Sequence, residues 1–448
     1  MATAYISRTP AGVGDLRKWT FSAWVKRGNL GGSQAIISWF GVSASYTTQL
    51  RFDSDNTINF YQYYGGYTAR LATTRLFRDV GAWYHIVAVW DTDNATAGDR
   101  MKLYVNGVEE TVFGTDTNPA LNLDSYANST NEFTIGAKGA AEYFDGEMSH
   151  VQFVNSAALA PTEFGEVDST SGIWKIKTSA YATPGTNGYF LKMEDRTNLD
   201  LDSSSNAYTF TTSGTLTATY DNPSNNFATV NPLANYASAS TFSNGNNTVT
   251  AHSTNHSWNI STMGVNKGKW YWEAKMTAAS APAGGSMIGI SGTQQFLSAK
   301  EMGNQEYTYG KAQNYTRYLY NNSSTTWGTT WSQNDIIGVA LDCDNSKLYM
   351  SVNGTWMESG DPTSGSTGTG AISLVDVSTT PQQVWSPSFG DWDSTWSSIW
   401  QVNYGNGYFG TTAVTSAEAD GAGIGAFEYA PPTGYYAICT KNIKAYGG

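Results

Sequence analysis

The chain is poor in cysteine, histidine and charge. Its 448 residues include 2 Cys and 4 His, and only 14% are charged. So few cysteines exclude a disulfide-rich secreted scaffold. Cys343 and Cys439 lie at or beside apolar segments, which favours two buried free thiols. A single bridge between them stays open as the alternative.

Long apolar runs and basic runs are also missing. No window holds the roughly 18 apolar residues that a membrane helix needs, and residues 1–5 (MATAY) lack the basic and apolar parts of a signal peptide. The net charge is −12, and no Lys or Arg run is long enough to follow a phosphate backbone. We expect a soluble protein made without a secretory signal, with no membrane insertion and no nucleic-acid partner.

Aromatic residues and turn formers are plentiful. The chain has 28 Tyr, 16 Trp and 46 Gly. Many aromatics with little charge can bury a large core, which argues against disorder. Frequent Gly, Asn, Ser and Thr favour strands and turns over helices. The length predicts two or three domains, and the composition predicts an all-β fold.

The first block, residues 1–165, shows the pattern of an antiparallel sandwich. Apolar residues alternate in 21–25, as in a half-buried strand. Residues 83–90 are apolar almost throughout, which predicts a central strand. Asn106-Gly107 is a strong hairpin signal. Short strands with frequent turns and no long helical period predict a β-sandwich.

The second block, residues 227–448, repeats this pattern. Residues 270–276 and 335–341 are strand-like, and Asn353-Gly354 predicts another hairpin. The connecting segment, 166–226, is too long for an ordinary structureless linker. We therefore expect a second antiparallel sandwich, and a connecting segment that packs partly on the first one.

Several motifs resemble known families. Four segments of the first block resemble the laminin-G-like, concanavalin-A-type jelly-roll family: Thr20–Trp24 (TFSAW), Trp83–Ile86 (WYHI), Leu103–Gly107 (LYVNG) and Phe144–Met148 (FDGEM). Five segments of the second block resemble a SPRY domain: Gly268–Glu273 (GKWYWE), Ile288–Ile290 (IGI), Asp335–Asp342 (DIIGVALD), Leu348–Gly354 (LYMSVNG) and Val402–Gly405 (VNYG).

The combination of the two domains is similar to structural and fibre-like proteins of marine tailed phages. That resemblance implies a virion protein, a tail fibre or capsid-surface appendage that contacts a host-surface glycan or protein. It also implies assembly in the host cytoplasm with other virion proteins, as a homo-oligomer. A capsid-cementing protein without a ligand stays open as an alternative.

An enzyme is the second alternative, because the jelly roll also hosts glucanases. A retaining glycosidase needs two carboxylates about 5–5.5 Å apart, and on a strand Glu-x-Asp-x-Glu would supply them. Glu166-Val-Asp168 and Glu418-Ala-Asp420 match only in part. We expect no enzymatic activity, while an enzyme that lacks the usual motif stays open.

Metal ligands are sparse. Asp91, Asp93 and Asp99 lie in an oxygen-rich loop of the kind that Ca²⁺ can use. An ordinary acidic loop explains them better, because their spacing matches no fixed ligand pattern. His252 and His256 would share a face only on a helix, and their polar surroundings favour a loop. We expect no cofactor.

Tyrosines supply the best candidate site. Tyr61, Tyr63, Tyr64 and Tyr67 surround Gly65-Gly66. Tyr offers a large contact area at low entropy cost, as in binding loops. The alternative is that the rings form core or hairpin pairs. The acidic net charge argues against anionic lipopolysaccharide phosphate, so a neutral sugar or a protein is the expected ligand.

A second aromatic set has a different spacing. Trp392, Trp396 and Trp400 recur every four residues. This spacing suits a short helix that presents its rings on one face, or three rings of the core.

Overall fold

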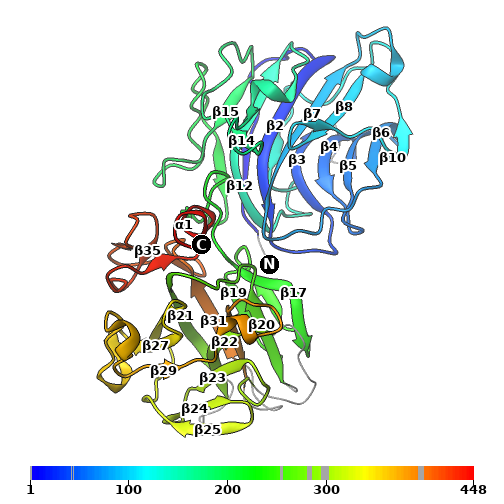
Figure 1. Ribbon diagram of the computed structural model, residues 1–448. Helices are drawn as coiled ribbons and strands as arrows, with labels where there is room; N and C mark the ends of the chain where they lie inside the picture. Colours follow the sequence, from blue (N-terminus) through cyan, green and yellow to red (C-terminus); the bar gives the residue numbers. More distant parts are fainter. Residues whose placement is uncertain are drawn as a thin grey trace. The chain divides into compact units, whose positions relative to one another are not determined.

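The computed structural model describes residues 3–41, 43, 45–252, 256–279, 285–293, 302–391 and 398–447. The chain divides into two compact units, Met1–Ala218 and Thr219–Gly448. Each unit is built on two large, mainly antiparallel sheets (Figure 1). The prediction of an all-β chain with two antiparallel sandwiches is confirmed.

The first unit pairs an eight-stranded with a six-stranded sheet. The eight-stranded order is β10-β6-β5-β4-β3-β11-β1-β16. Its strands are β1 (Tyr5–Arg8), β3 (Gln34–Phe40), β4 (Thr47–Phe52), β5 (Ile58–Tyr63), β6 (Tyr67–Thr73), β10 (Phe113–Thr117), β11 (Phe133–Ile135) and β16 (Thr211–Ser213). The six-stranded order is β15-β12-β2-β7-β8-β9. Its strands are β2 (Lys18–Arg27), β7 (Trp83–Asp91), β8 (Met101–Val105), β9 (Val108–Glu109), β12 (Gly146–Asn155) and β15 (Tyr189–Leu191).

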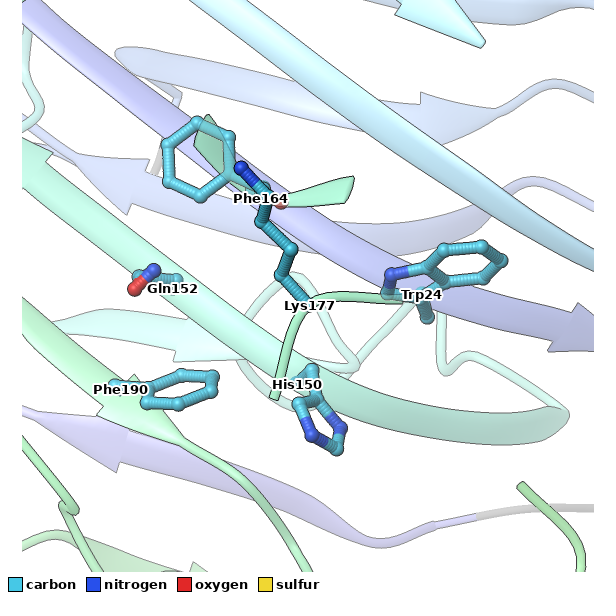
Figure 2. A pocket seen from close by; sticks show the side chains of 7 residues that line it. Trp24, His150, Gln152, Phe164, Lys177 and Phe190 are labelled. Atoms are coloured by element: carbon cyan, nitrogen blue, oxygen red, sulfur yellow. The ribbon is translucent and has the colours of Figure 1, made fainter. Parts of the chain in front are cut away.

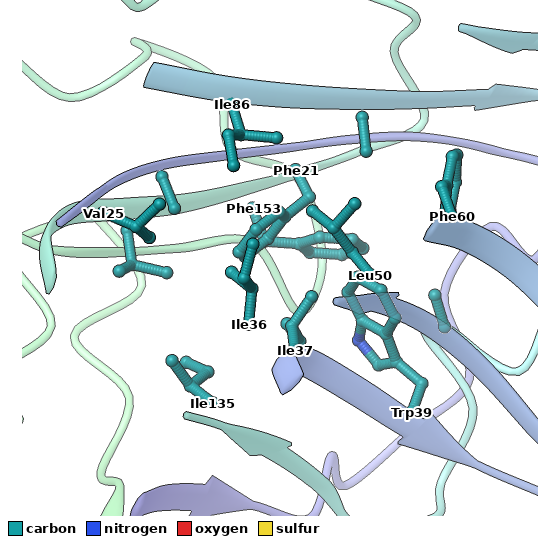
Figure 3. Close-up of a cluster of buried hydrophobic side chains, with 14 of the residues drawn as sticks. Phe21, Val25, Ile36, Ile37, Trp39, Leu50, Phe60, Ile86, Ile135 and Phe153 are labelled. Atoms are coloured by element: carbon teal, nitrogen blue, oxygen red, sulfur yellow. The ribbon is translucent and has the colours of Figure 1, made fainter. Parts of the chain in front are cut away.

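The core of this unit lies between the two sheets. Phe21 and Ile86 point inward from the six-stranded sheet and meet Leu50 and Phe60 of the eight-stranded one (Figure 3). Strand β7 lies inside its sheet, between β2 and β8. Its apolar sequence is thereby explained, because an interior strand covered on both faces exposes little polar surface.

Both Asn-Gly turns form as predicted. Asn106 (φ 51°) and Gly107 (φ 80°) join β8 to β9. Asn353 (φ 47°) and Gly354 (φ 79°) join β27 (Lys347–Val352) to β28 (Thr355–Trp356). Both central residues of each turn adopt left-handed backbone, which Asn and Gly tolerate best.

The connecting segment contributes to the first unit. Its first half contains β13 (Gly165–Val167) and β14 (Trp174–Ile176), which we call the strap hairpin. Beside this hairpin, Phe164 packs on Val87, Val89 and Val154 on the outer face of the six-stranded sheet. Farther on, β15 pairs with β12 and β16 pairs with β1. Residues 219–226 fall in the second unit.

The second unit pairs a seven-stranded with a nine-stranded sheet. The first has the order β17-β20-β30-β22-β23-β24-β25, and the second has β18-β19-β31-β21-β26-β27-β28 with β29 and β36 beside it. Strands of the first are β17 (Val230–Ala237), β20 (Ser257–Ser261), β22 (Ser286–Ser291), β23 (Thr308–Ala312), β24 (Arg317–Tyr320), β25 (Ser323–Thr326) and β30 (Ser386–Asp391). The other sheet adds β18 (Thr241–Ser243), β19 (Thr248–Thr250), β21 (Lys269–Ala279), β26 (Ile336–Asp342), β29 (Ile372–Ser373), β31 (Ser398–Asn403) and β36 (Tyr436–Ala437).

Helix is rare, as expected. The described residues contain one α-helix, α1 (Thr440–Tyr446), and no helix among them is long and apolar enough to cross a membrane. Within residues 434–439 only Tyr436–Ala437 form a strand, β36, and the helix begins directly after Cys439. Cys439 and Cys343 are both buried free thiols.

Candidate ligand-binding face

The eight-stranded sheet carries a polar and aromatic outer face. Successive side chains of a strand point to opposite faces, so the neighbours of inward Leu50 and Phe60 point outward. We call this surface the outer tyrosine face. It comprises Gln49, Arg51, Asn59, Tyr61, Tyr63, Tyr67 and Arg70, together with Asp53, Lys138 and Glu142 beside them.

Three of the four predicted tyrosines meet on this face. Tyr63 lies opposite Tyr67 across the β5–β6 hairpin, and Tyr61 lies opposite Arg70. The Tyr67 ring packs edge-on against the rings of both Tyr61 and Tyr63, with centroids 5.3 Å apart in each pair. Tyr67 is 44% exposed, whereas Tyr61 is only 3% exposed. Tyr67 can therefore touch a ligand, with the half-buried Tyr63 beside it, and Tyr61 supports them from below.

Tyr64 packs elsewhere. It lies in the turn, where its N–H donates to the Gly66 carbonyl at 2.8 Å. Its ring meets that of Tyr46 at 4.6 Å and remains 60% exposed. The four tyrosines predicted as one binding loop thus separate into two sets. The rings of Tyr61 and Tyr63 both contact Tyr67, whereas the ring of Tyr64 contacts Tyr46.

Buried hydrogen bonds hold Tyr61 in place. Its hydroxyl donates to Oε1 of Gln49. The Gln49 amide in turn donates to Ser38 Oγ and to Glu142 Oε2, each at 3.0 Å. Burial raises the pKa of Tyr61 well above its usual value, so the hydroxyl stays protonated and remains a donor.

Two carboxylates fix Arg51 on the same face. Its Nε lies 2.6 Å from Asp53 Oδ1, and its NH1 lies 3.1 Å from Glu142 Oε2. Asn59 links this ion pair to Arg70, since its amide donates to Asp53 Oδ2 at 2.7 Å and its oxygen accepts from Arg70 Nε at 3.3 Å. The side chains beneath the exposed rings are therefore held rigidly.

The other sheet bears a small pocket. Trp24, Phe164 and Phe190 line it with His150 and three more residues (Figure 2), and it measures about 200 Å³ including its opening. Ligand pockets usually span about 300–1,000 Å³. This one suits a water molecule or a small group rather than a sugar ring.

His150 occupies a β-bulge at this pocket with φ of 51°. Its Nδ1 lies 2.7 Å from Ser149 Oγ, and its Nε2 lies 3.3 Å from Glu194 Oε1. Burial lowers the pKa of His150 to about 4, although Glu194 opposes the shift. At neutral pH the ring is uncharged.

The second histidine of this region is locked in one tautomer. Trp174 Nε1 donates to His85 Nδ1 at 3.0 Å, and Ser22 Oγ lies 2.8 Å from His85 Nε2. An indole nitrogen only donates, so Nδ1 accepts and Nε2 carries the proton. Burial lowers the pKa of His85 to about 3. His85 therefore cannot accept the Ser22 proton, and the pair is no nucleophilic dyad.

The metal candidates do not converge. Asp91 lies 3.4 Å from the Lys18 amine, Asp99 lies 3.0 Å from that of Lys102, and Asp93 is exposed. Within the described ranges, no three His, Cys, Asp or Glu side chains form a group that could hold a metal ion. The structure therefore gives the calcium candidate no support.

The tryptophan set is only partly placed. Trp400 lies in strand β31 and is buried in the core of the second unit, so it belongs to no helix. Trp392 and Trp396 lie outside the described residues.

Sequence reasoning missed most of the supporting residues. Glu142, Asn59 and Arg51 bear no motif, and Glu142 joins Gln49 across 93 positions of the sequence. The alternation of strand residues could have placed Tyr61 and Tyr63 together, because residues two apart share a face.

Comparison with known proteins supports a lectin-type sandwich followed by a second β-sandwich domain. Residues 2–163 match the family model of the concanavalin A-like lectin/glucanases superfamily, and residues 269–369 match the SPRY domain model. These are the two families, in the order, that the sequence motifs indicate.

Solved structures resemble parts of the chain. The SPRY domain of human HERC1 is 12% identical, with a TM-score of 0.31, over 39% of this chain and 96% of that one. A heptameric SAP-like pentraxin from Limulus polyphemus is 20% identical, with a TM-score of 0.26, over 35% of this chain and 71% of that one. No curated protein matches the chain.

Proposed function

We propose that this chain is a non-enzymatic attachment protein that contacts a host-surface glycan through the outer tyrosine face. One observation carries the proposal: the accessible rings of Tyr63 and Tyr67 stand on a buried hydrogen-bonded network. Aromatic rings combine a large apolar face with a polar tip, which suits the mixed surface of a sugar. A prearranged site also loses little entropy on binding.

A virion role, as a tail fibre or capsid-surface appendage of a tailed phage, is the second part of the proposal. It rests on the resemblance of the two-domain combination to such proteins. Immunogold labelling of virions with an antibody against the chain tests it. Gold on tails or capsids is the expected result, and unlabelled virions beside labelled cell extract would refute it.

A glycan array tests the binding part. The wild-type chain should give signals without releasing product. The Tyr63→Ala/Tyr67→Ala double variant should lose them, and Tyr64→Ala should keep them, because Tyr64 packs on Tyr46 instead. Released sugar would indicate the enzyme alternative. No signal, with capsids that become unstable without the protein, would indicate the cementing alternative.

A further inference from the structure

We infer that the glycan carries a carboxylate, and that Arg70 of the outer tyrosine face binds it. The inference rests on the proposed glycan contact and names the chemical class of the ligand. It departs from the neutral sugar or protein that the acidic net charge suggests, because the local arrangement of charges differs from the total.

The other cations of this face are already neutralised. Arg51 contacts both Asp53 and Glu142, and Lys138 lies 4.0 Å from Glu142. Arg70 differs from them, since no carboxylate of the described ranges lies within 4.0 Å of its guanidinium. Within the described ranges Arg70 is therefore the cation of this face without a close ion pair, although the charge of Asp55 reaches it at longer range.

The fixed position of Arg70 leaves its outer edge available. Its Nε donates to Asn59 Oδ1 at 3.3 Å, and its Cζ lies 4.5 Å from the centre of the Tyr67 ring. These contacts hold the planar guanidinium through its Nε and its face. Its two terminal nitrogens can then bind a carboxylate with two parallel hydrogen bonds. A sugar ring that stacks on Tyr67 would bring its own carboxylate to this edge.

Asp55 is a further carboxylate that acts on Arg70, and it does so electrostatically from beyond 4.0 Å. Its Oδ1 accepts hydrogen bonds from the hydroxyl and N–H of Thr57, so Asp55 is held beside Thr57 rather than paired directly with Arg70. The net charge of −12 belongs to the whole chain. At physiological salt, charges more than about 8 Å apart are largely screened. Binding of a charged ligand on this face therefore depends on the charged groups of the face itself, such as Arg70, more than on distant carboxylates of the chain.

Matched saccharides test the inference. The full-length chain is titrated with galacturonan, mannuronan and glucuronan oligosaccharides, and with the same oligosaccharides after reduction of each carboxylate to a neutral alcohol. We expect at least one acid form to bind about tenfold or more tighter than its neutral form. Arg70→Gln should abolish that preference, and Arg70→Lys should keep only part of it, because a lysine lacks the planar fork.

Arg78→Gln is the control, because it removes the same charge at an exposed position outside the face. An acid preference that survives in Arg70→Gln, or that falls equally in Arg78→Gln, would overturn the inference. Equal binding of acid and neutral forms would also overturn it, while the proposed glycan contact would stand. If the chain bound none of these saccharides and gave no signal on the glycan array, both the proposed glycan contact and the carboxylate inference would be refuted.

Discussion

The indole N–H of Trp174 donates a 3.0 Å hydrogen bond to Nδ1 of His85, which lies 89 positions earlier in the sequence. This bond fastens the strap hairpin to the outer face of the six-stranded sheet. His85 also stacks on Trp24, with ring centres 4.8 Å apart. The first sandwich therefore extends past residue 165, because the segment that follows covers apolar residues of its sheet.

Trp174→Phe should destabilise the first unit by about 1–3 kcal/mol. The ring stays, but the buried His85 Nδ1 loses its donor, and an unpaired buried acceptor is costly. Chemical denaturation measures the change. Ile173→Ala is the matched control, since the Ile173 side chain is 66% exposed in the same hairpin, and an equal loss there would contradict the account.

Acid should weaken the first unit through His85. The folded state holds the pKa of His85 at about 3, below its ordinary value of 6.5. Between these values the unfolded chain binds a proton that the folded chain refuses, so stability falls as the pH drops below about 6.5, by about 1.4 kcal/mol per pH unit for this group. Denaturation at pH 7, 6 and 5 should show this slope, and His85→Asn should reduce it. An unchanged slope in the variant would assign the effect to other groups.

Glu273 fastens the C-terminal segment of the second unit. The backbone N–H groups of Glu428 and Tyr429 donate to its two oxygens at 2.8 Å each, and Tyr271 donates at 3.1 Å. Burial raises the pKa of Glu273 to about 7, although these hydrogen bonds oppose the shift. Stability from this group is then complete below its ordinary pKa of 4.5 and is lost as the pH rises through about 7.

Above pH 7, where Glu273 is ionised and accepts from all its donors, Glu273→Gln should destabilise the second unit by about 1–3 kcal/mol, because the amide turns a donor toward a backbone N–H. Hydrogen exchange of residues 426–429 should accelerate in the variant. Glu418→Gln, at an exposed position of the same region, should change neither quantity. Normal protection in Glu273→Gln would show that other contacts hold the segment.

The two cores should respond separately to loss of a tryptophan. Trp90 and Trp270 are fully buried, one in each unit. Each change to Ala should cost about 3–5 kcal/mol, and calorimetry should show one transition shifted and the other unchanged. A shift of both transitions by either variant would contradict two separate cores.

Local patterns predicted much of the fold. Strand β7 and both Asn-Gly turns could be predicted from the sequence, because the apolar pattern of a strand and the backbone conformation of a turn depend on neighbouring residues. The candidate site was harder to predict, because the residues that hold its tyrosines in place are distant from them in the sequence. Glu142 and Gln49 meet only after the sheet has formed, and no local pattern separates the environments of Tyr64 and Tyr67.

Calorimetric titration with the strongest glycan from the array tests the central claim most directly, using Tyr67→Ala and Tyr64→Ala variants whose melting temperatures are measured alongside. The account predicts that Tyr67→Ala weakens binding about tenfold or more, on the scale of one lost stacking contact. Tyr64→Ala should bind like the wild type, and both should melt close to it. Full affinity in Tyr67→Ala, or an equal loss in Tyr64→Ala, would contradict a binding site on the outer tyrosine face.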